Sequence, residues 1–96
     1  MNSIDQLKQQ LSSIFKEYSL DKAAVFGSYA RGEAKDSSDL DLLISSEKTF
    51  DLETYSEFVE ALERITAKKI DIVFYDYLNP YMKDNILKEA ISIYEQ

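Results

Sequence analysis

A chain of 96 residues is long enough for one small domain, and its formal net charge of −7 argues against binding along a nucleic-acid backbone, which requires a basic surface. Because the chain has no cysteine and no histidine, disulfides and thiolate or imidazole metal sites are excluded, zinc is disfavoured, and any metal must have oxygen ligands. It has neither the start of a signal peptide nor an apolar run near the roughly 18 residues of a membrane helix, so we expect one cytoplasmic domain over residues 1–96.

The first predicted element is a helix over residues 3–18, which Ser3 can cap. Its apolar residues recur at helical spacing: Ile4, Leu7, Leu11, Ile14 and Phe15. A short apolar strand, residues 22–26, follows and ends at Gly27.

The second strand is predicted over residues 39–45, after a short helix opening at residues 28–31 and a polar loop over residues 32–38. Alternate side chains of a strand face opposite sides of a sheet, so the apolar and acidic positions separate. One face carries Leu40, Leu42 and Ile44, and the other carries Asp39 and Asp41.

The second half of the chain predicts a long helix, a third strand over residues 69–75, a helix from Pro80 to about Ala90, and a short last strand over residues 91–94. The long helix begins at Asp51 or Thr49, with an apolar stripe of Leu52, Tyr55, Phe58, Val59, Leu62 and Ile65. The last strand either pairs within the sheet or forms an interface. These elements predict an α/β (α+β) domain, a small mixed β-sheet with flanking helices.

The acidic residues of the second and third strands are the candidate site. Two adjacent carboxylates repel unless a cation lies between them, and magnesium is usually held by one or two carboxylates together with substrate phosphates. Asp71 lies within an apolar strand, where a carboxylate is costly unless paired or metal-bound. If the two strands are neighbours, Asp71 joins Asp39 and Asp41. The alternatives are solvated strand or turn positions for the first two residues and a paired or edge position for Asp71.

A family resemblance rests on a motif: Gly27-Ser28, ten further residues, then Asp39-Leu40-Asp41, with the isolated Asp71 in a later strand. This pattern resembles the DNA polymerase beta nucleotidyltransferase superfamily. Its minimal nucleotidyltransferase branch is more similar still, because there the motif often reads Gly-Ser-x-Ala-Arg-Gly, as residues 27–32 do. The resemblance extends over the whole chain and implies a polymerase-beta-like nucleotidyltransferase fold.

The resemblance implies that the loop at residues 27–32 binds nucleotide. Gly27 would let the backbone approach the triphosphate, and the hydroxyl of Ser28 would contact the β- and γ-phosphates. Arg31 would either reach phosphate or brace the loop through a salt bridge to Glu33, Asp36 or a site aspartate. Tyr29 could stack on a base.

The resemblance also implies the chemistry. Asp39 and Asp41 would ligate one or two Mg²⁺ ions, and Asp71 would complete the metal site and orient or deprotonate the acceptor hydroxyl. That hydroxyl would attack the α-phosphate of ATP, and pyrophosphate would leave.

The chain resembles members of the minimal branch that work with a separate HEPN-domain toxin, for which the nucleotidyltransferase is the antitoxin. The resemblance therefore implies transfer of AMP to a tyrosine of a HEPN partner, in a homo- or hetero-oligomer, without direct contact to nucleic acid or membrane. Two alternatives stay open: a binding module that masks its partner without catalysis, and an enzyme that modifies a small molecule such as an aminoglycoside. An acidic surface suits a protein partner better than RNA.

Overall fold

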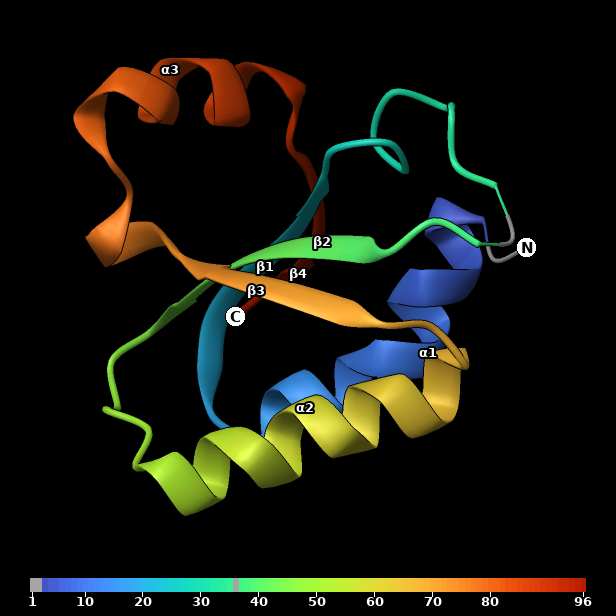
Figure 1. Ribbon diagram of the computed structural model, residues 1–96. Helices are drawn as coiled ribbons and strands as arrows, with labels where there is room; N and C mark the ends of the chain where they lie inside the picture. The colour runs from blue at the N-terminus through green and yellow to red at the C-terminus, as the bar shows by residue number, and fades with distance from the viewer. Residues whose placement is uncertain (1–2, 36) are drawn as a thin grey trace.

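The computed structural model describes residues 3–35 and 37–96, and within them four strands form one mixed sheet in the order β3-β2-β1-β4 (Figure 1). Strand β1 is antiparallel to both β2 and β4, whereas β2 and β3 are parallel. The elements in chain order are α1 (Ile4–Glu17), β1 (Leu20–Phe26), β2 (Leu40–Ser46), α2 (Leu52–Thr66), β3 (Ile70–Phe74), the short 3₁₀ turn η1 (Tyr75–Tyr77), α3 (Pro80–Glu89) and β4 (Ile91–Glu95). The predicted fold class is confirmed, and the last strand pairs within the sheet.

Helix α1 begins where its sequence predicts. The Ser3 side chain accepts a hydrogen bond from the Gln6 N–H at 3.1 Å, and the Ser3 N–H donates to the Gln6 side chain at 2.8 Å. This reciprocal capping box satisfies two donors that the first helical turn cannot pair internally. The apolar stripe then packs on the sheet, with four buried residues: Leu7, Leu11, Ile14 and Phe15.

Helix α2 is capped by Asp51, whose carboxylate accepts the Thr54 N–H at 2.7 Å. Its buried residues are spaced by four: Phe58, Leu62 and Thr66. Two residues of the predicted stripe are exposed instead, Leu52 at 83% and Ile65 at 43%. Both lie at the edges of the stripe around the helix, where the sheet no longer covers them. Membership of the predicted stripe therefore did not mean burial for these two residues.

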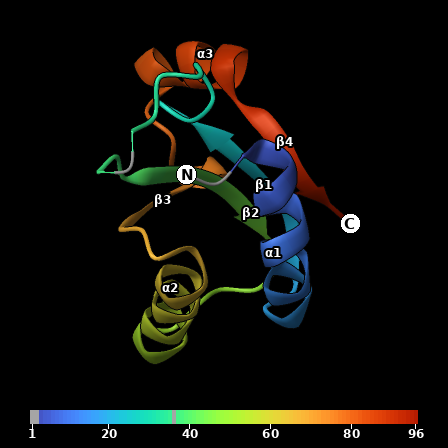
Figure 2. The ribbon, with the colours of Figure 1, turned by 90° about the vertical axis from the view of Figure 1, so that its right-hand side faces the viewer.

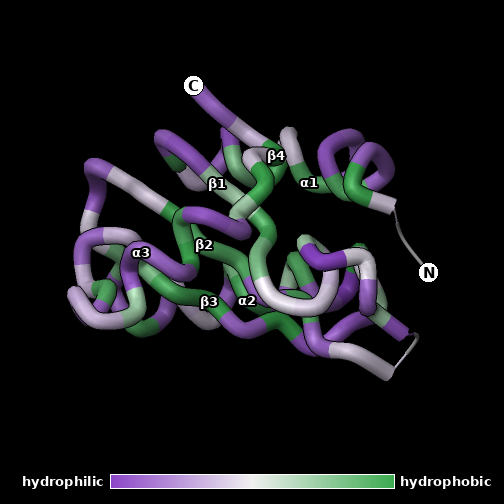
Figure 3. Tube along the Cα trace, turned by 90° about the horizontal axis from the view of Figure 1, so that it is seen from above, coloured by the Kyte–Doolittle hydropathy of each residue, from purple (hydrophilic) through white to green (hydrophobic). Residues whose placement is uncertain are grey.

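The two faces of the sheet have different covers. Helices α1 and α2 lie on one face, and α3 lies on the opposite side (Figures 1 and 2). Side chains of β2 divide between them: Leu40, Leu42 and Ile44 are fully buried under α1 and α2, whereas Asp41 is only half-buried on the other side. Seen from the α3 side, the apolar trace of β2 crosses the centre of the molecule (Figure 3).

Residues 28–31 do not open a helix that continues. The Arg31 N–H donates to the Gly27 carbonyl at 3.1 Å, which closes a single helical turn. The Glu33 N–H then bonds the Ser28 carbonyl at 2.9 Å and the Gly32 N–H bonds the Tyr29 carbonyl at 3.3 Å, while Gly32 has φ +73°. This is the hydrogen-bond pattern with which a left-handed glycine ends a helix. The predicted short helix is therefore one turn within a loop.

No helix in the described ranges, 3–35 and 37–96, is both long enough and apolar enough to cross a membrane.

Candidate active site

The three aspartates meet at one end of the β2–β3 pair. Asp41 of β2 is the register partner of Asp71 of β3, and Asp39 lies just before β2. Parallel neighbours in a sheet are about 4.8 Å apart, so the two partnered carboxylates extend from adjacent positions on the same face. The condition set by the sequence, that the second and third strands be neighbours, is met.

The charges of these carboxylates act on one another. Burial, followed by the negative charges of Asp71 and Asp39 and a hydrogen bond with Asp71, raises the pKa of Asp41 above its ordinary value. The positive charge of Arg31 opposes this rise. A half-buried carboxylate beside two like charges is less favourable in its ionised form than a carboxylate in water, and a divalent cation would relieve that repulsion.

The donor set suits magnesium bound with a substrate. Among residues 3–35 and 37–96, no three acidic side chains form a group ready to enclose a metal ion. Mg²⁺ rarely uses a cage made only of protein, because it keeps waters and takes further oxygens from substrate phosphates. The paired Asp41 and Asp71, with Asp39 close enough to raise the pKa of Asp41, supply oxygen ligands of the required kind.

Gly27 connects the end of β1 to the aspartates. Its φ of +73° is a conformation that residues with a side chain rarely adopt, and a Cβ added there would collide with Oδ2 of Asp41. The glycine therefore allows the loop to lie directly against the Asp41 carboxylate. In the described part of the chain, the N–H groups of Ser28, Tyr29 and Ala30 donate no hydrogen bond. Consecutive free N–H groups of this kind can receive a phosphate.

Arg31 is held by two carboxylates. Its Nε donates to Glu33 Oε2 at 3.0 Å, and its Nη1 donates to both Glu89 oxygens at 3.2 Å. Of the salt bridges expected from the sequence, the one to Glu33 is present, and Asp36 lies outside the described residues. Glu89 was missed, because only the pairing of β4 with β1 brings the end of α3 to this loop.

Tyr29 is not available to stack on a base. Its side chain is 7% exposed and belongs to the hydrophobic core, and its hydroxyl oxygen is buried without a partner among the described residues. The Lys68 ammonium lies 5.9 Å from the ring centroid. The suggested base contact was wrong, since the helical turn directs this ring inward.

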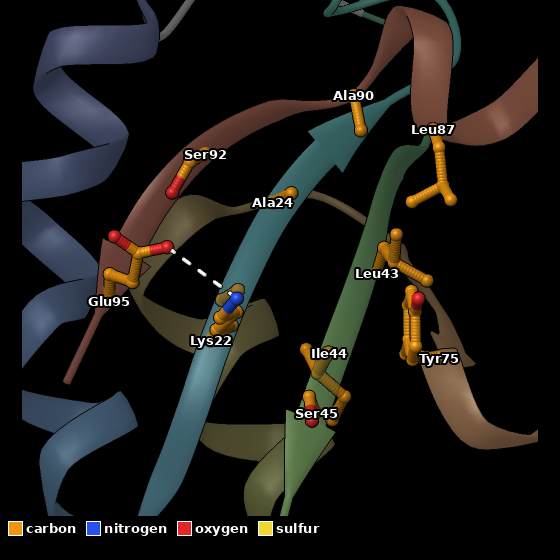
Figure 4. A pocket seen from close by; sticks show the side chains of 11 residues that line it. Lys22, Ala24, Leu43, Ile44, Ser45, Tyr75, Leu87, Ala90, Ser92 and Glu95 are labelled. Carbon is orange, nitrogen blue, oxygen red and sulfur yellow. Dashed lines mark ion pairs between the residues drawn. The ribbon is translucent and has the colours of Figure 1, made fainter.

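The face of the sheet that does not contact α1 and α2 is called the open face. A groove of about 420 Å³ lies on this face (Figure 4). Leu43 of β2 and Ala24 of β1 form part of its floor, and Tyr75, Leu87 and Ala90 belong to the segment that crosses above them. The groove shares a sheet face with Asp41, two residues from Leu43 along β2. It offers a mostly apolar surface next to the carboxylates.

The chain is similar to known nucleotidyltransferases in sequence and in fold. Residues 9–96 match the family model described as polymerase beta, nucleotidyltransferase. Protein adenylyltransferase MntA of Thermococcus cleftensis is 30% identical over 97% of this chain and 98% of that protein. A solved structure described as a minimal nucleotidyltransferase has a TM-score of 0.78 and 33% identity, covering 94% of this chain and 95% of the other.

A more distant structure shares the fold. It contains a tri-AMPylated Shewanella oneidensis HEPN toxin in complex with a minimal nucleotidyltransferase antitoxin. The match has a TM-score of 0.73 at 14% identity, and it covers 97% of this chain and 73% of the matching chain.

Proposed function

Since this chain belongs to the polymerase beta nucleotidyltransferase family, we propose that it is a magnesium-dependent protein adenylyltransferase that silences a HEPN toxin by transferring AMP to one of its tyrosines. One observation carries this proposal: Asp41 faces Asp71 across β2 and β3, directly against the loop that begins at Gly27. A metal, a triphosphate and an acceptor hydroxyl must meet in one place for this reaction, and the arrangement provides such a place.

In the proposed site, Asp39 and Asp41 hold one or two Mg²⁺ ions, and Asp71 contributes to the same site. The metal supplies charge stabilisation to the phosphate oxygens when bound. Asp71 is more exposed than Asp41, so it suits the side from which the acceptor arrives. It orients the acceptor hydroxyl and takes its proton as the oxygen attacks the α-phosphorus of ATP. The bond between the α-phosphorus and the bridging oxygen breaks, and pyrophosphate leaves.

The loop after β1 binds the triphosphate in this proposal. The free N–H groups of Ser28, Tyr29 and Ala30 and the Ser28 hydroxyl are donors in one helical turn, beside the carboxylate that would hold the metal. Backbone donors at the start of such a turn favour anions. Gly27 contributes the close approach, because any side chain there would displace Asp41.

The partner is proposed to be a HEPN toxin, and the enzyme to be cytoplasmic, where ATP and magnesium are available. Support comes from the names of its relatives: one is a protein adenylyltransferase, and a structural neighbour is complexed with an AMPylated HEPN toxin. The exposure of Asp71 leaves this end of the site accessible to a side chain of a docked protein. We further propose that residues 1–96 act as one nucleotidyltransferase domain.

The test is to incubate the protein with ATP, Mg²⁺ and its HEPN partner and to record the partner's mass. We expect additions of AMP with wild type and none with the Asp39→Asn, Asp41→Asn double variant. The matched control is Glu60→Gln with Asp84→Asn, which removes the same charge at two exposed positions. If the folded wild type adds no AMP, the proposal fails. If the aspartate variant protects cells as well as wild type does, masking of the toxin explains neutralisation better than catalysis.

A further inference from the structure

Glu89, the last residue of α3, contacts both ends of the loop formed by residues 27–32. Its Oε1 accepts the Gly27 N–H at 2.7 Å, and its two oxygens accept Arg31 Nη1 at 3.2 Å each. The turn after β1 and the end of α3 lie side by side in two views of the ribbon (Figures 1 and 2). One carboxylate therefore joins the start of the loop to its end.

The register of the sheet explains why this side chain is so placed. Val25 of β1 pairs with Ile91 of β4, so two further steps along the antiparallel ladder would bring Gly27 opposite Glu89. Glu89 is helical rather than extended, so its backbone does not continue the β4 ladder and offers no carbonyl to the Gly27 N–H. The Glu89 carboxylate accepts the Gly27 N–H in its place, and so keeps the end of β1 fixed beyond the last paired residue.

We propose that Glu89 is a positioning residue for the nucleotide-binding loop and that Arg31 braces this loop instead of binding phosphate, an inference that rests on the proposed function. The Arg31 guanidinium is shared between Glu33 and Glu89, so its charge is already matched by two carboxylates. A phosphate would have to compete with both of them for this charge, and drawing Glu89 away would leave the Gly27 N–H without its acceptor. The donors left for the triphosphate are those of residues 28–30.

The bond to Gly27 also bears on the metal ligand. Gly27 lies so close to Asp41 that even a methyl group would collide with the carboxylate. A small movement of Gly27 would therefore change both the aspartate and the loop. Glu89 touches neither nucleotide nor metal in this account, and it acts through Gly27 and Arg31.

The experiment measures the affinity for Mg–ATP by calorimetry, well below the unfolding temperature of each variant. Glu89→Ala removes both contacts and is expected to raise the dissociation constant about tenfold or more, the usual effect of losing a charge-assisted hydrogen bond. Glu89→Gln keeps an acceptor for Gly27 but loses the charge opposite Arg31, and a loss of about threefold is expected. Asp84→Asn is the control, since it removes one charge from the exposed side of α3 without losing a contact.

Either of two results with the single Glu89 variants overturns the inference. If Glu89 instead competes with the triphosphate, both Glu89 variants will bind Mg–ATP more tightly than wild type. If Glu89 only stabilises the fold, both will bind as well as the control does. The Arg31→Gln, Glu89→Gln double variant should bind Mg–ATP no more weakly than the single variant with the lower affinity, because both changes break the same contact. Purely additive losses would indicate that Arg31 reaches phosphate by itself.

A second measurement separates this inference from the proposed function. The amide resonances of Gly27 and of residues 28–32 should shift in Glu89→Gln without nucleotide and stay unchanged in Asp84→Asn. If wild type fails to bind Mg–ATP, the proposed function fails even where these shifts appear. If wild type binds and the loop resonances do not move, the inference alone fails.

Discussion

The two faces of the sheet are built from the same strands and have opposite chemistry. Leu40, Leu42 and Ile44 of β2 face α1 and α2 and are fully buried, and the residues between them face the open side. There Asp41 lies among like charges. The helix-covered face gains stability from burial, while the open face retains repulsion that a bound cation would remove. This small domain therefore derives its stability from one face and presents its paired carboxylates on the other.

The largest effect is expected on the covered face. Phe58→Ala should lower the free energy of unfolding by about 3–5 kcal/mol, because Phe58 is fully buried and its loss would leave a cavity. Its ring lies 5.0 Å from that of Tyr18 and 5.5 Å from that of Phe50, measured between centroids. Chemical denaturation measures the change. Leu52→Ala on the same helix is the control, since Leu52 is 83% exposed, and an equal loss there would contradict the assignment of the core.

Gly27→Ala tests the close contact between the loop after β1 and Asp41 on the open face. We expect it to lower the free energy of unfolding by about 2–3 kcal/mol, because the left-handed backbone would be strained and the new methyl group would collide with Asp41. Gly32→Ala is a close control, because Gly32 has the same φ of +73° but open space around it, so only the backbone cost of about 1–2 kcal/mol applies. Equal losses in the two variants, measured by thermal unfolding, would show that contact with Asp41 is unimportant.

The pH dependence of stability should differ in sign between the two aspartates Asp41 and Asp51. Folding raises the pKa of Asp41, so without metal its ionisation costs stability as pH rises from its ordinary pKa of 3.8 through the raised value. Folding lowers the pKa of Asp51 through its hydrogen bonds to Thr54, so its stabilisation is present above pH 3.8 and is lost as pH falls through the lowered value.

Denaturation in EDTA across this pH range measures both effects. Asp41→Asn should equal or exceed wild type in stability at neutral pH, by less than about 1 kcal/mol because water screens the half-exposed site. Asp51→Asn should be less stable than wild type at neutral pH, and the difference should shrink in acid. A loss of stability in Asp41→Asn at neutral pH would contradict the repulsion described for the open face.

The smallest effect is expected for Glu95→Gln at the edge of the open face. Glu95 pairs with Lys22 at 3.8 Å, and both side chains are about two-thirds exposed, at 65% and 68%. Such pairs contribute less than about 0.5 kcal/mol. A larger loss in urea denaturation would mean that charges on the open face contribute to stability after all.

Local patterns predicted the elements of this fold well. The Ser3 and Asp51 caps, the apolar stripe of α1 and the start of α3 at Pro80 each depend on neighbouring residues in the chain. The failures concern edges and distant contacts. Leu52 has the right spacing for the stripe of α2, but only the extent of the sheet decides whether it is covered.

The sequence predicted the motif residues of the candidate site, but not the residue that holds the loop in place. The spacing of Asp39, Asp41 and the Gly27 turn can be read along the chain, and Asp71 needed only one assumption about neighbouring strands. Glu89 carried no such signal, because it reaches the loop from 62 residues away through the pairing of β4 with β1. Tyr29 looked available within the motif, but the turn that ends at Gly32 directs it into the core.

We propose that three carboxylates on the open face, Asp39, Asp41 and Asp71, bind a metal–nucleotide complex. Calorimetry of ATP binding, with and without Mg²⁺, tests it most directly on wild type and on the Asp39→Asn, Asp41→Asn variant. We predict binding by wild type only when Mg²⁺ is present, and loss of that binding in the variant. Equal affinity in the two proteins, or affinity unchanged by magnesium, would contradict the account.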